Sequence, residues 1–131
     1  MEAIQQRSIA TWPRTLLLVL LAEKIVQHVA VTTGFAINWH GMRSTVAVSP
    51  DSLMYSGAFI AVAFAAALWA AWTRRGWVRG LVIALALFDM IGEFIAKGTI
   101  WIPLNVSFIV ATALLLLALF ARRETFSPEM N

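Results

Sequence analysis

The chain has 131 residues, of which 60% are hydrophobic and 13% are charged, and ten basic against seven acidic side chains give a net charge of +3. Average soluble domains have about 45–50% apolar and about 25% charged residues, so this composition excludes an ordinary water-soluble globule and a disordered tail. The chain has no cysteine, which excludes disulfides, thiolate metal sites and thiol catalysis.

Four segments are long and apolar enough to cross a bilayer, which takes roughly 20 mostly apolar residues in a helix. They cover about residues 15–37, 53–72, 81–102 and 104–121. Four spans leave almost no chain for a soluble domain. The sequence therefore predicts one transmembrane domain over the whole chain, an all-α four-helix bundle in contact with the lipid bilayer.

Prolines mark several predicted helix ends. Pro13 lies just before the first span, where a first-turn proline is tolerated. Pro50 opens the second span, with Asp51 or Ser52 as the expected N-cap. Pro103 separates the third span from the fourth, so we expect a very short connection there.

A cleaved signal peptide is an alternative interpretation of the first span, because a run of leucines begins at Leu16. Leu20 occupies a position where an A-x-A cleavage site ending at Ala22 needs a small residue. The apolar pattern also continues to Ile37. Both observations favour an uncleaved span.

Basic residues gather at three of the five segments outside the spans. They are Arg7 and Arg14, then Arg74, Arg75 and Arg79, then Arg122 and Arg123. The first loop has only Arg43, so the positive-inside rule predicts that both termini are cytoplasmic. Short basic clusters beside apolar runs are typical of membrane topology, and we expect no nucleic-acid partner.

A shift of 65 residues aligns the first span with the third, placing Trp12 on Trp77 and Arg14 on Arg79. Two interpretations remain open at this stage. Any two spans of the same orientation share basic and aromatic flanks. Alternatively, a two-helix hairpin has been duplicated, which predicts a parallel repeat about an axis along the membrane normal.

Polar and ionisable side chains inside the first and third spans form the candidate ion or substrate site. They are Glu23, Lys24, Gln27, His28, Asp89, Glu93 and Lys97. At 100° per residue each set forms a stripe along one side of its helix. Unpaired charges cost several kcal/mol or more in lipid, so we expect these groups to face each other, a partner or water.

Depth predicts how the two stripes pair. With a rise of about 1.5 Å per residue from the arginine that opens each span, Lys24 and Asp89 both lie about 15 Å deep. His28 and Glu93 both lie about 21 Å deep. Neighbouring parallel helices would therefore place Lys24 opposite Asp89 and His28 opposite Glu93.

The charge of this set suggests a function. Its three carboxylates and two lysines sum to −1 while His28 is neutral, so a proton or a cation completes the balance. The leading hypothesis is a small proton- or cation-linked transporter or channel-like protein, with homo-oligomers expected because four short helices enclose little volume.

Two alternatives use the same residues. The charges can instead fix helix geometry in an accessory or structural subunit of a larger membrane complex. An intramembrane enzyme would use Asp89 or Glu93 as acid and His28 as base, although the sequence favours a protein that is not an enzyme. His28 is the only histidine inside a span, and His40 reaches it only if the first loop folds inward, so we expect no metal, haem or other cofactor.

Three strings carry a resemblance: EKIVQH at 23–28, VSPD at 48–51 and LFDMIGEF at 87–94. They resemble those of an uncharacterised group of small four-span bacterial membrane proteins. The resemblance covers most of the chain and implies an integral protein of the bacterial cytoplasmic (inner) membrane. It implies no activity.

Overall fold

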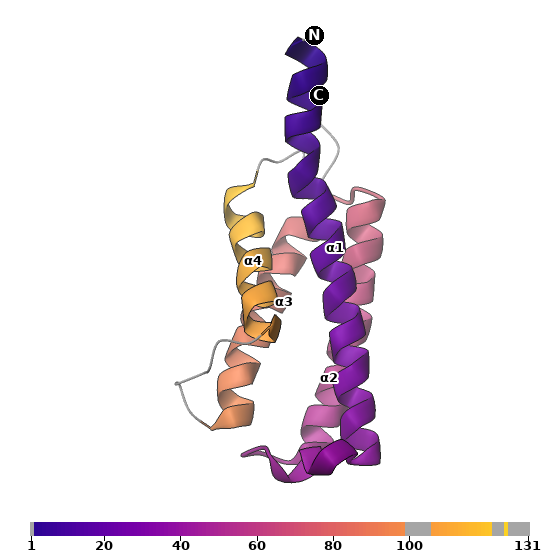
Figure 1. Cartoon of the computed structure of the whole chain (residues 1–131), viewed down its shortest axis with the longest axis vertical. Helices are drawn as coiled ribbons and strands as arrows, with labels where there is room; N and C mark the ends of the chain where they lie inside the picture. Colours follow the sequence, from indigo (N-terminus) through magenta and orange to yellow (C-terminus); the bar gives the residue numbers. More distant parts are fainter. Residues whose placement is uncertain (1, 99–105, 122–124, 126–131) are drawn as a thin grey trace.

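The computed structural model describes residues 2–98, 106–121 and 125, and for residues 2–11 and Lys97 it describes the backbone alone. Four α-helices and one short 3₁₀ helix cover most of this part of the chain, and no β-strand occurs in it. The elements are α1 (Glu2–Ile37), η1 (Trp39–Ser44), α2 (Pro50–Trp72), α3 (Val78–Lys97) and α4 (Val106–Phe120) (Figure 1). The predicted all-α class is confirmed.

Two of the helices are long and apolar enough to cross a membrane. They are the Trp12–Ile37 part of α1 and the whole of α2. α4 is apolar but has 15 residues, and α3 has 20 residues that include Asp89 and Glu93. Length and composition of the observed helices thus support two of the four predicted spans.

Helices α1 and α3 have different ends from those predicted. α1 begins at Glu2, so Pro13 lies inside the helix rather than in its first turn. α3 ends at Lys97, before the predicted end near residue 102, because Gly98 has a φ of 70°, a left-handed conformation that ends helices. Pro103 and the connection predicted there lie outside the described residues.

The start of α2 also differs from the prediction. Ser49 is the N-cap, and its hydroxyl accepts a hydrogen bond from the Ser52 backbone N–H at 3.3 Å. Pro50 occupies the first helical position, where its missing N–H costs nothing. The expected cap at Asp51 or Ser52 is wrong, since Asp51 lies in the first turn and pairs with Arg43.

The helices form two antiparallel hairpins, α1–α2 and α3–α4, that pack side by side (Figure 1). α1 also contacts α4, and α2 contacts α3, which leaves α1 and α3 diagonally opposite each other. Both run in the same direction. Side chains that join α1 to α3 must therefore cross the middle of the bundle.

Each hairpin is tied at one end by an arginine. The Arg14 Nη2 atom donates to the Trp72 carbonyl at 3.2 Å, and the Arg79 Nη2 atom donates to the Ala121 carbonyl at 2.7 Å. Both arginines thus satisfy carbonyls that a helix leaves unpaired at its C-terminus. We call this end of the bundle the arginine end, and the end that carries residues 38–49 the loop end.

The hydrophobic core fills the half of the bundle nearest the arginine end. All four helices contribute to it, through Leu17, Leu21, Phe64, Ala67, Ala70, Ala71, Val78, Val82, Leu85, Ala86, Leu114, Leu117 and Ala118. The alanines allow the helix backbones to approach closely. Toward the loop end the two hairpins diverge, and polar side chains take the place of this core.

Candidate functional site

Lys24 is completely buried and joins three helices. Its Nζ atom donates to Gln27 Oε1 at 3.0 Å, to the Ser107 carbonyl at 2.8 Å and to Ser107 Oγ at 3.2 Å. It also lies 2.5 Å from Asp89 Oδ2. An ammonium group has three hydrogens. Gln27 and Ser107 together offer three acceptors, one for each hydrogen, in addition to the Asp89 carboxylate.

Asp89 bridges Lys24 and His28. Its Oδ1 atom lies 3.0 Å from His28 Nε2, while Oδ2 faces Lys24, and only 10% of its side chain is exposed. The predicted Lys24–Asp89 pair is confirmed. The structure gives His28 this same partner rather than the expected place opposite Glu93, because Lys24 and His28 lie one turn apart on the same face of α1 and converge on one carboxylate of the diagonal helix.

His28 brings α2 into the cluster. Its ring stacks on Phe64, with the ring centroids 5.6 Å apart and the planes 16° from parallel. Lys24, His28, Phe64, Asp89 and Ser107 therefore meet where all four α-helices face the bundle interior. We call these five residues the central cluster.

Close pairs hold two buried atoms of the central cluster. Asp89 Oδ2 faces the Lys24 ammonium at 2.5 Å, and His28 Nε2 lies 3.0 Å from Asp89 Oδ1. A proton or a cation that joins the cluster therefore competes with these pairs.

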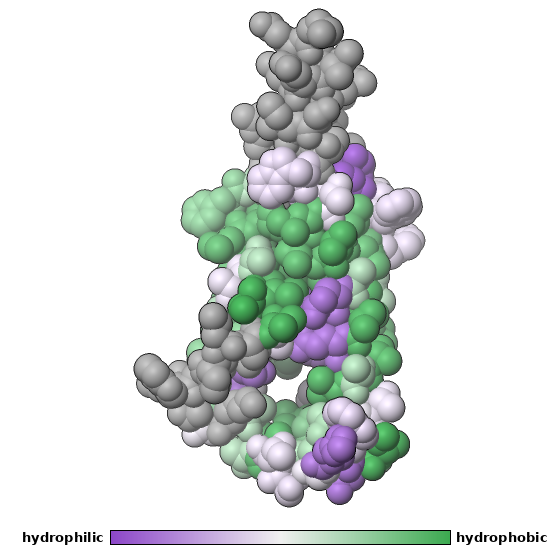
Figure 2. Space-filling model, viewed as in Figure 1, coloured by the Kyte–Doolittle hydropathy of each residue, from purple (hydrophilic) through white to green (hydrophobic). Residues whose placement is uncertain are grey.

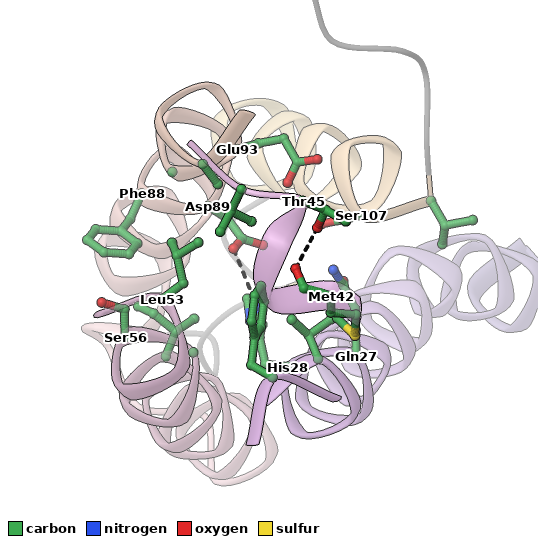
Figure 3. Close-up of a pocket in the computed structure, with 18 residues that line it drawn as sticks. Gln27, His28, Met42, Thr45, Leu53, Ser56, Phe88, Asp89, Glu93 and Ser107 are labelled. Carbon is green, nitrogen blue, oxygen red and sulfur yellow. Dashed lines mark hydrogen bonds and ion pairs between the residues drawn. The ribbon is translucent and has the colours of Figure 1, made fainter. Parts of the chain in front are cut away.

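A cavity of about 480 Å³ extends from the central cluster toward the loop end. Polar side chains of Gln27, His28, Asp89, Glu93 and Ser107 line it, and Figure 3 shows them around the opening between the helices. We call this group the polar floor. The volume falls within the range typical of small-molecule sites.

Apolar side chains form the walls of the same cavity. Val31 and Phe35 come from α1, Ile60 from α2, Phe88 from α3 and Val106 from α4. A ligand held here would thus meet a polar surface at one end and hydrocarbon around its body.

The loop between α1 and α2 closes the mouth of the cavity with Met42, Thr45 and Val46. The Ala47 N–H donates to the Ala96 carbonyl at 2.9 Å, which ties this loop to α3.

Arg43 fastens the other side of the loop to the ends of two helices. Its Nη1 atom donates to the Phe35 carbonyl at 3.1 Å, and its Nη2 atom pairs with Asp51. The loop is therefore attached to α1, α2 and α3.

The predicted site residues divide into three groups. Lys24, Gln27, His28 and Asp89 lie together, and Glu93 lines the cavity beside them. Glu23 does not line the cavity, and its buried Oε2 atom has no hydrogen-bond partner in the described part of the chain. The side chain of Lys97 lies outside the described residues.

Ser107 and Phe64 belong to the site but were not predicted from the sequence. A serine and a phenylalanine are ordinary in apolar helices, so neither residue carries a signal until its neighbours are known. Their roles depend on which helices are adjacent: α4 supplies two acceptors to Lys24, and α2 supplies the stacking surface for His28.

The site offers acid–base and electrostatic chemistry. Among the described residues, no three histidine, cysteine or carboxylate side chains are grouped so as to hold a metal ion. The cluster can hold a proton on His28 or Asp89 and can attract a cation to the polar floor. Comparisons of this chain with protein-family models, with curated proteins and with solved structures found no match.

Proposed function

We propose that this protein is a four-span membrane protein that moves a proton or a small cation through the site at the centre of its bundle. In this proposal the arginine end and both termini face the cytoplasm, and the membrane is the bacterial cytoplasmic membrane that the sequence resemblance implies. The charged site lies in the interior between spans one and three.

Surface composition supports the membrane location. Large hydrophobic side chains are exposed on every α-helix, for example Val26, Phe59, Ile91 and Leu116, and apolar groups cover much of the face in Figure 2. A water-soluble monomer rarely exposes so much contiguous apolar surface. Together with two helices of spanning length, this favours a protein whose outer surface meets lipid.

The cavity carries the proposal for transport. It reaches the central cluster from the loop end, while the packed core closes the bundle between the cluster and the arginine end. An ionisable site in mid-bundle that a packed core separates from one end of the protein is the arrangement expected for one state of an alternating-access carrier. A site serving only to hold helices together would not need a cavity of about 480 Å³ beside it.

The charges of the cluster support coupling to protons or cations. Asp89 faces Lys24 through Oδ2 and His28 through Oδ1, and all three side chains are largely buried. Protonation of His28 or Asp89 makes the cluster more positive, and a bound cation has the same electrostatic effect. The two events therefore compete, which is the basis of exchange between a proton and another cation.

Reconstitution into liposomes tests this function. Vesicles that contain a pH-sensitive dye are given a pH gradient, and sodium, potassium or small organic ammonium salts are added outside. We expect cation-dependent proton movement with the wild-type protein and none with His28→Ala or Asp89→Asn. Gly80→Leu is the control, because Gly80 lies outside the cavity lining and a Cβ there meets no atom within 4 Å.

A second candidate is an intramembrane acid–base enzyme. The observation that favours it is the approach of His28 Nε2 to Asp89 at 3.0 Å within a cavity large enough for a substrate. Chemical conversion of a ligand incubated with purified protein, without proton movement in vesicles, would support the enzyme. Co-purification in a fixed ratio with other membrane subunits would instead favour the accessory role, and a defined homo-oligomer favours the transporter.

A further inference from the structure

We infer that the cavity binds a protonated hydrophobic amine, with the ammonium group on Asp89 and the apolar body between the walls. The inference rests on the proposed function in one respect, that this cavity is the ligand site. It adds the chemical class of the ligand, which the charges and walls of the cavity specify separately.

The polar floor selects the sign of the ligand's charge. Two carboxylates, Asp89 and Glu93, line the cavity, and the described lining contains no lysine or arginine. Lys24 is buried behind the lining and does not reach the cavity. The charged side chains that line the cavity are therefore acidic, which favours a cationic ligand over an anionic one.

Asp89 is the carboxylate able to receive an ammonium group. Lys24 keeps hydrogen bonds to Gln27 and to two Ser107 acceptors when the aspartate turns to another cation. The buried Asp89 Oδ2 atom, which faces Lys24 at 2.5 Å, would then face the ammonium group of the ligand instead. The exchange leaves no buried ammonium hydrogen unsatisfied, which is the usual obstacle to opening a buried ion pair.

The cavity walls select the body of the ligand. Val31, Ile60 and Val106 present aliphatic surface, and Phe35 and Phe88 present aromatic rings. Rings near an ammonium group add cation–π attraction. A cavity of about 480 Å³ is also far larger than a bare metal ion requires.

The shape of the bundle gives such a ligand a route from the bilayer. The two hairpins diverge toward the loop end (Figure 1), and the cavity lies between them at this level. An amine with an apolar body partitions into the membrane interface, with its charge at the surface. It therefore meets the opening from the lipid side.

Three probes with the same body test the head group: 2-phenylethylammonium, trimethyl(2-phenylethyl)ammonium and 2-phenylethanol. Calorimetric titration of the full chain in detergent gives their dissociation constants. We expect the primary ammonium to bind at least tenfold more tightly than the other two, because only it is both charged and able to donate hydrogen bonds to Asp89. Equal binding of the alcohol, or no binding of the amine, would overturn the inference.

Two glycines of α3 give a matched test of the place of binding. Gly92 lines the cavity and Gly80 does not, and a Cβ at either position meets no atom within 4 Å. Gly92→Leu should fold and weaken amine binding at least tenfold by filling the cavity, whereas Gly80→Leu should bind like the wild type. Asp89→Asn should abolish the preference for the amine over the alcohol. Unchanged binding in Gly92→Leu would place the amine elsewhere and overturn the inference.

The outcomes also separate this inference from the proposed transport. Amine binding without proton movement in vesicles would support the inferred ligand class and contradict the proposed transport function. Proton movement driven by sodium or potassium, with no amine binding, would sustain transport and overturn the ligand class.

Discussion

Lys24 and Asp89 lie on the two diagonal helices of the bundle, yet their Nζ and Oδ2 atoms are 2.5 Å apart. The contact crosses the bundle interior, so it links the two hairpins through the middle rather than along an interface. Lys24 is fully buried and the Asp89 side chain is 10% exposed. Charges so far from water depend on each other for their stability.

The first prediction concerns this mutual dependence. Lys24→Met leaves the Asp89 carboxylate buried without its cation and removes the donor from Gln27 and Ser107. We expect a loss of about 3–5 kcal/mol in the free energy of unfolding, as for other broken buried pairs. Denaturant titration in mixed micelles, followed by circular dichroism, measures it.

A double-mutant cycle supplies the control for that prediction. Lys24→Met combined with Asp89→Asn removes both charges. The double variant should therefore lose about 1–3 kcal/mol less free energy of unfolding than the two single variants lose in sum. Strict additivity would mean that the two residues do not stabilise each other and would contradict the structure's account of the pair.

The second prediction concerns pH and His28. The ionisable groups facing or near its ring are Asp89, Lys24 and Glu93. In the proposed exchange a proton and a cation compete for this part of the site. Cation binding should therefore strengthen as the pH rises.

His28→Gln removes the imidazole while keeping a polar side chain. We expect cation binding by this variant to depend less on pH than binding by the wild type, as measured by titration at a series of pH values. Phe64→Leu is the companion variant, because it removes the stacking surface of His28 but not its proton, so pH dependence should persist. A pH profile unchanged in His28→Gln would assign the dependence to another group.

Much of the site follows from simple helix geometry, and the limit of that geometry is visible at His28. Equal depth along two parallel helices was sufficient to pair Lys24 with Asp89. A comparison of depths assumes that α1 and α3 are neighbours. The two helices are diagonal instead, so their side chains meet at one point in the bundle interior. This convergence brings His28 to Asp89 as well.

The residues that sequence reasoning missed or misplaced share a physical cause. Periodicity assigns a residue to a face of its own helix but does not identify the helix opposite, so Ser107 could not be recognised as a partner of Lys24. Glu23 fell within the predicted stripe, yet it lies about one turn closer to the arginine end than Gln27 and does not line the cavity. Local signals are just as incomplete at helix ends, where Ser49 rather than Asp51 caps α2.

The third prediction concerns the attachment of the loop by Arg43. Its pair with Asp51 is partly exposed, so Arg43→Ala should change the free energy of unfolding by no more than about 1 kcal/mol. The same variant also removes the hydrogen bond to the Phe35 carbonyl. Amide hydrogen exchange of residues 38–49 should therefore accelerate several-fold while exchange in the helices is unchanged.

Asp51→Asn separates the two contacts of Arg43, because it removes the ion pair and leaves the bond to Phe35. We expect a smaller acceleration in this variant than in Arg43→Ala. If the loop exchanges at the wild-type rate in Arg43→Ala, the bond between Ala47 and Ala96 alone holds the loop in place.

The fourth prediction concerns orientation, and the absence of cysteine makes it direct to measure, since any introduced thiol is unique. Ser44 and Gly76 are both exposed and lie at the loop end and the arginine end. A membrane-impermeant maleimide should label Ser44→Cys in intact cells, but should label Gly76→Cys and a cysteine appended after Asn131 only after permeabilisation. Labelling of all three from outside would contradict the proposed topology, and labelling of the appended cysteine but not of Gly76→Cys from outside would give an odd number of crossings after Gly76. The expected pattern requires an odd number of crossings between Ser44 and Gly76 and an even number after Gly76, with the cavity mouth on the side away from the cytoplasm.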